Sequence, residues 1–293
     1  MANTTFFHNR SDSLPSRPHP LIAQLDDHIS RLRISDAAST SSSTSIANKL
    51  THLQDLHDCV DKLLLLPLTQ QALLAHHQNR KCVDELLDGS LRLLDVCNAA
   101  KDALLQTKEY TLELESTIRR RQNGVEIEVK KYLTSRKMAK KSIQKALSNL
   151  KGLEKKCFSS SNGSDDIGKI ISILKEVEVI TLSVFKSFLS FVYGAPKGLF
   201  SKSSNWALVS KLMVHKRIAS DEEEEEGVLD VNEFATADSA LESFVGSKYD
   251  NNAENVQSHL KNLELCIQDL EEGTHSLFRR LIKTRVSLLN IFN

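Results

Sequence analysis

Apolar residues recur at alternating spacings of three and four over several long stretches of this sequence. Because an α-helix has about 3.6 residues per turn, this spacing places the apolar side chains on one face of a helix. Residues 83–118, 125–157 and 260–291 each hold the pattern over several turns. The last stretch carries Leu260, Leu263, Ile267, Leu270, Thr274, Leu277, Leu281, Thr284, Leu288 and Ile291. The pattern predicts an all-α fold, a bundle of long antiparallel amphipathic helices.

Helix-breaking residues divide these stretches. Pro67 ends or kinks a helix that starts near Leu50, and Asn123-Gly124 supplies a turn between residues 83–118 and 125–157. We therefore expect these two stretches to pack as an antiparallel helical hairpin. Residues 167–193 are apolar on nearly every side, which predicts the most buried helix of the bundle.

Composition supports the same fold class and points inside the cell. Aromatic residues make up 5% of the chain, and its 293 residues include 10 Gly and 5 Pro, so little strand is expected. Five widely spaced cysteines fit reduced, buried thiols better than a disulfide framework. Lys and Arg together equal Asp and Glu at 38 each, so no overall field draws the chain to nucleic acid, and no specific nucleic-acid binding is predicted.

Local composition predicts three regions. Residues 1–20 form a disordered Ser/Pro/Arg arm, and residues 21–48 hold a short helix followed by a Ser/Thr-rich linker. Residues 49–293 form the helical bundle domain, interrupted at about 218–232 by a disordered acidic loop that contains a run of glutamates.

The sequence carries no targeting or spanning segment that we recognise. Residues 1–20 lack the apolar core of a signal peptide, and charged side chains interrupt the apolar run at 167–193. We therefore expect an intracellular, cytoplasmic protein without a transmembrane helix.

Side chains that could act in catalysis or bind a metal are present, but their spacing does not match that of a catalytic or metal site. His52 and His57 are five residues apart, His76 and His77 are adjacent, and none pairs with a cysteine or carboxylate at zinc-ligand spacing. There is no glycine loop for phosphate and no nucleophile elbow. The sequence predicts neither a catalytic residue nor a cofactor nor a metal, and the protein is not expected to be an enzyme.

Basic residues concentrate between Arg119 and Lys156, where thirteen stand against three acidic residues. Four of them, Lys130, Lys137, Lys141 and Lys145, fall close together around the predicted helix, and we call these four the basic stripe. The stripe suits weak contact with an anionic membrane, or an acidic partner. The alternative is a solvated face that acidic helices partly neutralise, which the absence of interleaved aromatic residues favours.

The N-terminal arm contains a short motif built on Arg10, Ser13 and Pro15. Its spacing resembles the phosphopeptide motif bound by 14-3-3 proteins. A phosphate on Ser13 would carry nearly two negative charges into an arginine cluster, while Pro15 turns the chain out of the groove. The arm is therefore a candidate 14-3-3 site. The alternative is that the motif is a chance match in a solvated tail.

Five segments resemble the plant BYPASS-related family, catalogued as a domain of unknown function: residues 8–20, 85–95, 180–185, 269–273 and 277–285. The resemblance implies a plant protein linked to root and shoot development. It brings no catalytic residue to carry over.

Together these features predict a non-enzymatic adaptor or regulatory protein that acts through helical surfaces. A peripheral membrane protein that uses the basic stripe and an enzyme of unknown type are the alternatives. The apolar face at 260–291 either packs into the same bundle or pairs with a second copy, so a monomer and a coiled-coil homodimer both stay open.

Overall fold

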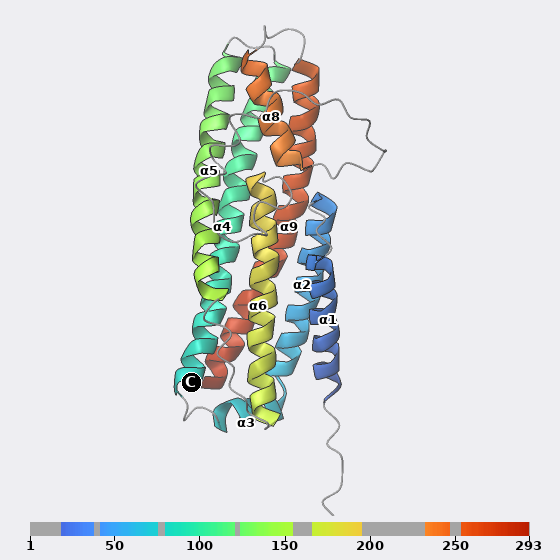
Figure 1. The fold of residues 1–293 in the computed structure, drawn as a ribbon, viewed down its shortest axis with the longest axis vertical. Helices are drawn as coiled ribbons and strands as arrows, with labels where there is room; N and C mark the ends of the chain where they lie inside the picture. The colour runs from blue at the N-terminus through green and yellow to red at the C-terminus, as the bar shows by residue number, and fades with distance from the viewer. Residues whose placement is uncertain are drawn as a thin grey trace, which may run out of the picture.

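A computed structural model describes residues 19–37, 42–75, 80–120, 124–154, 166–194, 232–246 and 253–292. Every regular element in these ranges is an α-helix, which confirms the predicted all-α class. The helices are α1 (Pro20–Ala37), α2 (Ser43–Leu64), α3 (Pro67–Ala75), α4 (Arg80–Arg119), α5 (Val125–Glu154), α6 (Asp166–Tyr193), α8 (Glu233–Gly246) and α9 (Ala253–Phe292). They form one elongated bundle (Figure 1).

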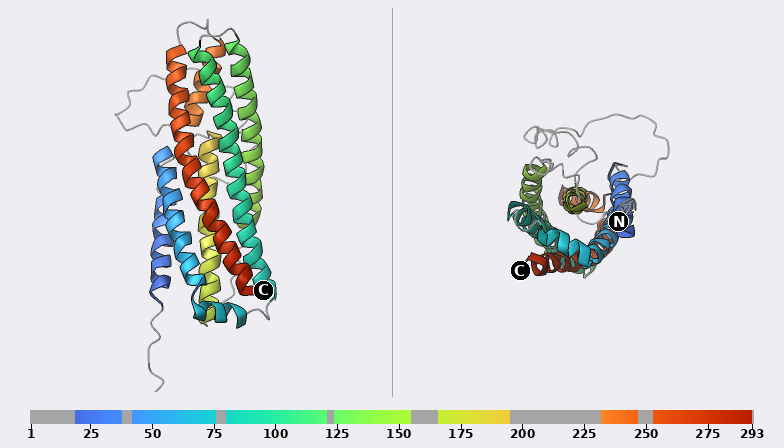
Figure 2. Two further views of the ribbon diagram at one scale, coloured as in Figure 1. Left: turned by 180° about the vertical axis from the view of Figure 1, so that it is seen from behind. Right: turned by 90° about the horizontal axis from the view of Figure 1, so that it is seen from below.

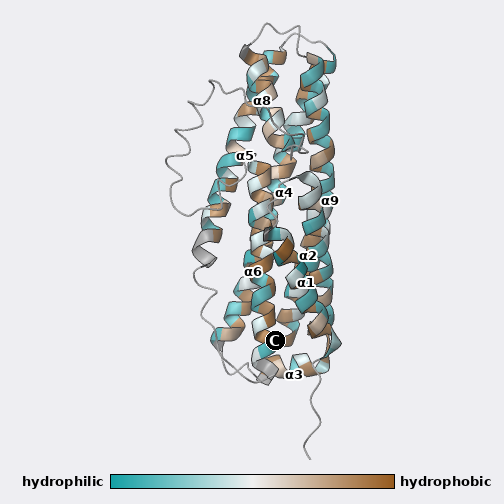
Figure 3. Ribbon diagram, turned by 45° about the vertical axis from the view of Figure 1, so that its right-hand side comes forward, coloured by the Kyte–Doolittle hydropathy of each residue, from teal (hydrophilic) through white to brown (hydrophobic). Residues whose placement is uncertain are grey.

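Helices α4 and α5, which correspond to the stretches at 83–118 and 125–157, form the expected hairpin. α4 and α5 pack against each other, and α5 begins directly after Gly124, whose φ of 109° is a conformation that glycine adopts freely. α9 packs on α4 and on α2, and the whole apolar series at 260–291 is buried by these contacts. This face of the C-terminal helix is thus part of the bundle core. Figure 3 shows hydrophilic and hydrophobic residues alternating around the long helices, as amphipathic helices require.

α6 occupies the middle of the bundle. It contacts α1, α2, α3, α4, α5 and α8, and the end-on view in Figure 2 shows the other helices in an arc around it that is open on one side. Phe185, Phe188 and Phe191 are among its fully buried or nearly buried side chains. The prediction that this stretch forms the most buried helix therefore agrees with its position. Of the described helices, none combines the length and the apolarity that crossing a membrane requires.

The N-terminal region differs in detail from the prediction. α2 starts at Ser43, inside the stretch expected to be a linker, because the Ser42 side chain caps the helix by accepting a hydrogen bond from the Ser45 amide. α1 packs on α2 and α6, and Asp36 at its end accepts hydrogen bonds from Ser183 and Ser187 of α6. α1 and the start of α2 are therefore part of the bundle.

α8 is a helix that the sequence analysis did not identify. Asn232 caps it by accepting a hydrogen bond from the Ala235 amide at 3.0 Å and donates another to the Phe191 carbonyl at 2.9 Å. The rings of Phe191 and Phe234 meet edge to face, with centroids 5.6 Å apart. Residue 232, assigned to the acidic loop from sequence, thus anchors α8 on the end of α6. Residues 1–18 and 218–231 of the predicted arm and loop lie outside the described residues.

Candidate functional site

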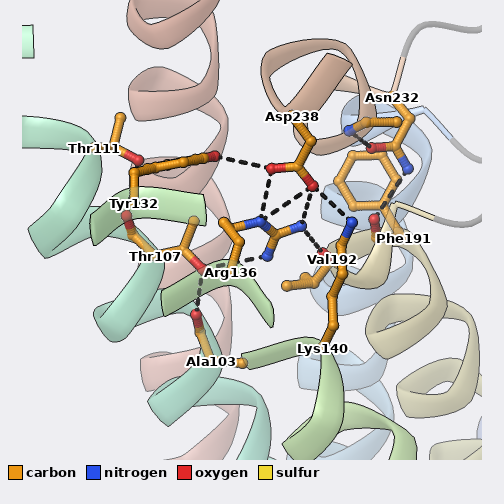
Figure 4. A network of polar contacts seen from close by, with 11 residues as sticks. Ala103, Thr107, Thr111, Tyr132, Arg136, Lys140, Phe191, Val192, Asn232 and Asp238 are labelled. Carbon is orange, nitrogen blue, oxygen red and sulfur yellow. Dashed lines mark hydrogen bonds and ion pairs between the residues drawn. The ribbon is translucent and has the colours of Figure 1, made fainter. Parts of the chain in front are cut away.

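A buried ion pair joins the middle of α5 to α8. The Arg136 Nε atom lies 3.1 Å from the Asp238 Oδ1 atom, and the two side chains are 2% and 8% exposed (Figure 4). Two more side chains of α5 reach the same carboxylate. The Tyr132 hydroxyl donates to Oδ1 at 3.2 Å, and the Lys140 Nζ atom lies 2.8 Å from Oδ2. Asp238 therefore gathers three polar side chains from one helix.

The guanidinium of Arg136 also connects two further helices. Its Nη2 atom donates to the Val192 carbonyl near the end of α6 at 3.0 Å, and its Nη1 atom donates to the Thr107 hydroxyl of α4 at 3.4 Å. The Thr107 hydroxyl in turn donates to the Ala103 carbonyl at 2.7 Å. Four helices thus meet at one arginine, which fixes the α8 segment against the α4–α5 hairpin.

The electrostatics of this network favour fixed protonation states. Burial alone would raise the pKa of Asp238, but the charges and hydrogen bonds of Arg136 and Lys140 outweigh burial and hold that pKa below its usual range. Burial and the neighbouring Asp238 carboxylate raise the pKa of Tyr132. A carboxylate that stays charged and a phenol that stays neutral hold a structure together, whereas acid–base catalysis works best with groups that titrate near the working pH.

The basic stripe runs along the opposite side of α5. All four of its lysines are exposed, in agreement with the face that their spacing predicts. Lys130 forms an ion pair with Glu126 at 2.6 Å. Within the part of the chain that the structure describes, no ion pair or hydrogen bond joins Lys137, Lys141 or Lys145 to another residue. α5 therefore turns Arg136 and Lys140 inward to a carboxylate and these three lysines outward to solvent.

Apolar side chains share this outer face. Ile127 is 61% exposed and Met138 is 57% exposed, and both line a shallow groove of about 550 Å³ between α4 and α5. Tyr110 of α4 also lines the groove, together with Lys130 of the stripe. The groove thus combines positive charge with exposed apolar surface.

The thiols of the described cysteines are shielded by packing. The four described cysteines, Cys59, Cys82, Cys97 and Cys266, are free. Burial raises the pKa of each thiol, that of Cys97 to about 12, which opposes the thiolate form that a nucleophile or metal ligand needs. Over the described ranges, no group of three His, Cys, Asp or Glu side chains is placed to hold a metal ion.

The pairing of Arg136 with Asp238 was not predicted from the sequence, and the 14-3-3 motif stays a prediction. Arg136 stands within the apolar series of α5, between buried Tyr132 and Ala139, and a cation in such a position needs a counter-ion. Its partner is 102 residues away, on a helix that was not identified. Arg10, Ser13 and Pro15 lie outside the described residues.

Comparisons with known proteins identify the family of this chain. The family model described as "Protein BPS1" matches residues 49–291, from α2 to the last turn of α9. A search of curated proteins and a search of solved structures each find no match. Because the family model covers most of the chain, the protein belongs to the Protein BPS1 family.

Proposed function

We propose that this protein is a non-enzymatic adaptor or regulatory protein, and that the outer face of α5 is its main contact surface for acidic partners. The developmental role in plant roots and shoots that the BYPASS-related resemblance implies is part of the proposal. The observation that carries it is the division of charge on α5, where Lys137, Lys141 and Lys145 are exposed without a partner among the described residues.

The spacing of these three lysines strengthens the proposal. They stand four residues apart, so each lies about one helical turn from the next on the same face. Like charges at this spacing destabilise a helix by about 0.2–0.5 kcal/mol per pair, so the fold gains nothing from them. An acidic partner would remove the repulsion and add favourable charge contacts.

The buried groups support a non-catalytic role. The strongest shifts move ionisable groups away from neutral pH, since burial lowers the pKa of His57 to about 4 and raises that of Cys97 to about 12. General acids and bases are most effective when their pKa lies near the working pH. These groups therefore suit a packed core better than proton transfer.

A binding titration tests the proposal. Fluorescence anisotropy of a labelled short poly-glutamate peptide is measured with the wild-type chain and with Lys137→Gln/Lys141→Gln/Lys145→Gln. The control variant, Arg31→Gln/Lys62→Gln/Lys81→Gln, removes the same charge from exposed residues on other helices. The proposal predicts binding about tenfold weaker for the α5 variant, from roughly 0.5 kcal/mol per lysine, and little change for the control. Equal affinities in all three proteins would contradict it.

Peripheral membrane association is the second candidate, and the exposed Ile127 and Met138 beside the lysines favour it. Flotation with vesicles of phosphatidylcholine alone and of phosphatidylcholine with phosphatidylserine distinguishes the two. If the candidate holds, the wild-type chain floats only with the anionic vesicles, and Ile127→Ser/Met138→Ser weakens flotation more than it weakens peptide binding. A chain that binds the peptide and floats with neither vesicle excludes the membrane candidate.

A further inference from the structure

α9 has a second regular stripe on the face that points away from the bundle. Its members are all exposed and are again spaced alternately by three and four: Leu265, Gln268, Glu272, His275, Arg279, Ile282 and Val286. We call them the outer α9 stripe. It is distinct from the buried series at 260–291, and it spans about 32 Å at 1.5 Å per residue.

The outer α9 stripe is complementary to a second copy of itself that runs in the opposite direction. Leu265 and Val286, which are 50% and 48% exposed, lie equally far on either side of the midpoint between His275 and Ser276. Glu272 and Arg279 also lie equally far on either side of that midpoint. A second α9 laid antiparallel across this midpoint therefore brings acid to base twice and apolar to apolar twice. Such self-matching is what a two-fold interface between identical chains requires.

The two ions of the stripe have no other partner among the described residues. Neither Glu272 nor Arg279 forms an ion pair or hydrogen bond there, whereas the adjacent Glu271 pairs with Lys108 of α4 at 2.5 Å. Glu272 and Arg279 are seven residues apart, about 10 Å along the helix, and so cannot readily pair with each other. Both charges are thus available to another molecule.

The neighbouring helix extends the surface. α4 runs antiparallel to α9, with Lys101 over the Phe278 ring and the carbonyl of Leu87 at Arg285. A groove of about 760 Å³ lies between the two helices at the midpoint of the stripe, with Leu105, His275 and Ser276 in its lining. Leu91 and Leu112 of α4 are also exposed, and they stand fourteen residues before and seven residues after Leu105, a spacing that puts them near the same face of α4.

We infer that the outer face of α4 and α9 binds a second copy of this chain, with the two α9 helices antiparallel about a two-fold axis near His275. The match of Glu272 to Arg279 sets the register, and Leu265, Val286 and Leu105 supply apolar contact beside it. This interface is separate from the outer face of α5, which stays exposed in the dimer.

Charge-swap variants of the full-length chain test the inference by sedimentation equilibrium over a range of concentrations. The wild-type chain dimerises, whereas Glu272→Arg and Arg279→Glu each place like charges together twice and weaken dimerisation roughly tenfold or more. The double variant Glu272→Arg/Arg279→Glu restores the pairing and the wild-type dimer. Lys62→Glu, a charge reversal on exposed α2 surface, leaves dimerisation unchanged.

Cross-linking tests the register. A short bis-maleimide joins two copies of His275→Cys, while Leu265→Cys alone is not joined because its two positions lie about 32 Å apart across the axis. A mixture of Leu265→Cys and Val286→Cys is joined. The wild-type chain measures background from its own five cysteines. A monomer at every concentration, or a dimer that ignores the single and double charge swaps, overturns the inference. Capture of a different protein by this face without self-association overturns it equally.

Discussion

Arg136 of α5 and Asp238 of α8 form a buried ion pair, with N···O distances of 3.1 Å, between helices that are about a hundred residues apart in the chain. The same arginine donates to the Val192 carbonyl, so α6 is held at the same point. This pair explains how α8 is fixed on the bundle. The attachment of α8 depends on the Asp238 carboxylate, which Arg136, Lys140 and the phenol of Tyr132 on α5 surround.

Removing Asp238 leaves Arg136 as an unpaired buried charge, which typically costs about 3–5 kcal/mol, whereas removing Arg136 leaves Asp238 with Lys140 as its counter-ion. We expect Asp238→Ala to lower the free energy of unfolding by this amount and Arg136→Met to lower it by less. The double variant costs clearly less than the sum of the two, because it leaves no buried charge unpaired. Urea denaturation of the four proteins measures the cycle. Single variants that cost under about 1 kcal/mol would show that α8 does not depend on this pair.

His57 of α2 makes the free energy of unfolding depend on pH in the mildly acidic range. It is buried, and its Nε2 atom lies 3.1 Å from the Thr181 hydroxyl, which donates its own hydrogen to the Val177 carbonyl. His57 Nε2–H must therefore donate. The pKa of His57 is lowered to about 4, mainly by burial; the Asp58 carboxylate raises this pKa and the positive charge of Arg280 lowers it.

As the pH falls from about 6.5 to about 4, the unfolded chain takes up this proton and the folded chain does not, so stability falls. The full loss is about 3 kcal/mol, of which roughly 2 kcal/mol is reached at pH 5. Urea denaturation at pH 7 and pH 5 should show this difference for the wild-type chain and for His52→Gln, an exposed control on the same helix. In His57→Gln the difference should shrink by about 2 kcal/mol. An unchanged difference would mean that His57 takes up its proton without unfolding.

Gly89 of α4 lies directly beneath the Glu178 carboxylate of α6. A Cβ atom at this position would be 2.4 Å from the Glu178 Oε2 atom, while Arg92 holds the same carboxylate at 2.7 Å. Alanine normally stabilises a helix interior by about 1 kcal/mol over glycine. Here it has to displace a buried carboxylate that is already bonded.

We therefore expect Gly89→Ala to destabilise the wild-type chain and to stabilise the Glu178→Ala variant. Thermal unfolding of the four combinations measures the change of sign. If Gly89→Ala has the same effect in both backgrounds, the close approach does not limit this position.

The sequence predicted the helices better than the contacts between them. The three-four spacing at 260–291 predicted a long helix with one apolar face, and the structure buries that face. Spacing along α5 also predicted that the four lysines of the basic stripe share one face, and all four are exposed; what this face binds stays a prediction. The Asn232 cap and the apolar positions Phe234, Ala237 and Leu241 could have indicated α8 by the same rule.

The buried pair could not be predicted in this way. Because position 136 lies within the apolar face of α5, the sequence indicates a buried cation there. The choice of Asp238 as its partner, however, depends on how α8 packs against α5. That packing is long-range, and local periodicity carries no information about it.

Quantitative affinity capture from plant tissue tests the central proposal, that the protein works through the outer face of α5. Wild-type chain, Lys137→Gln/Lys141→Gln/Lys145→Gln and the control Arg31→Gln/Lys62→Gln/Lys81→Gln serve as baits, and captured proteins are quantified by mass spectrometry. The account predicts a defined set of acidic partners that the wild-type and control baits retain and the α5 variant loses. Capture of the same proteins in the same amounts by all three baits would contradict it.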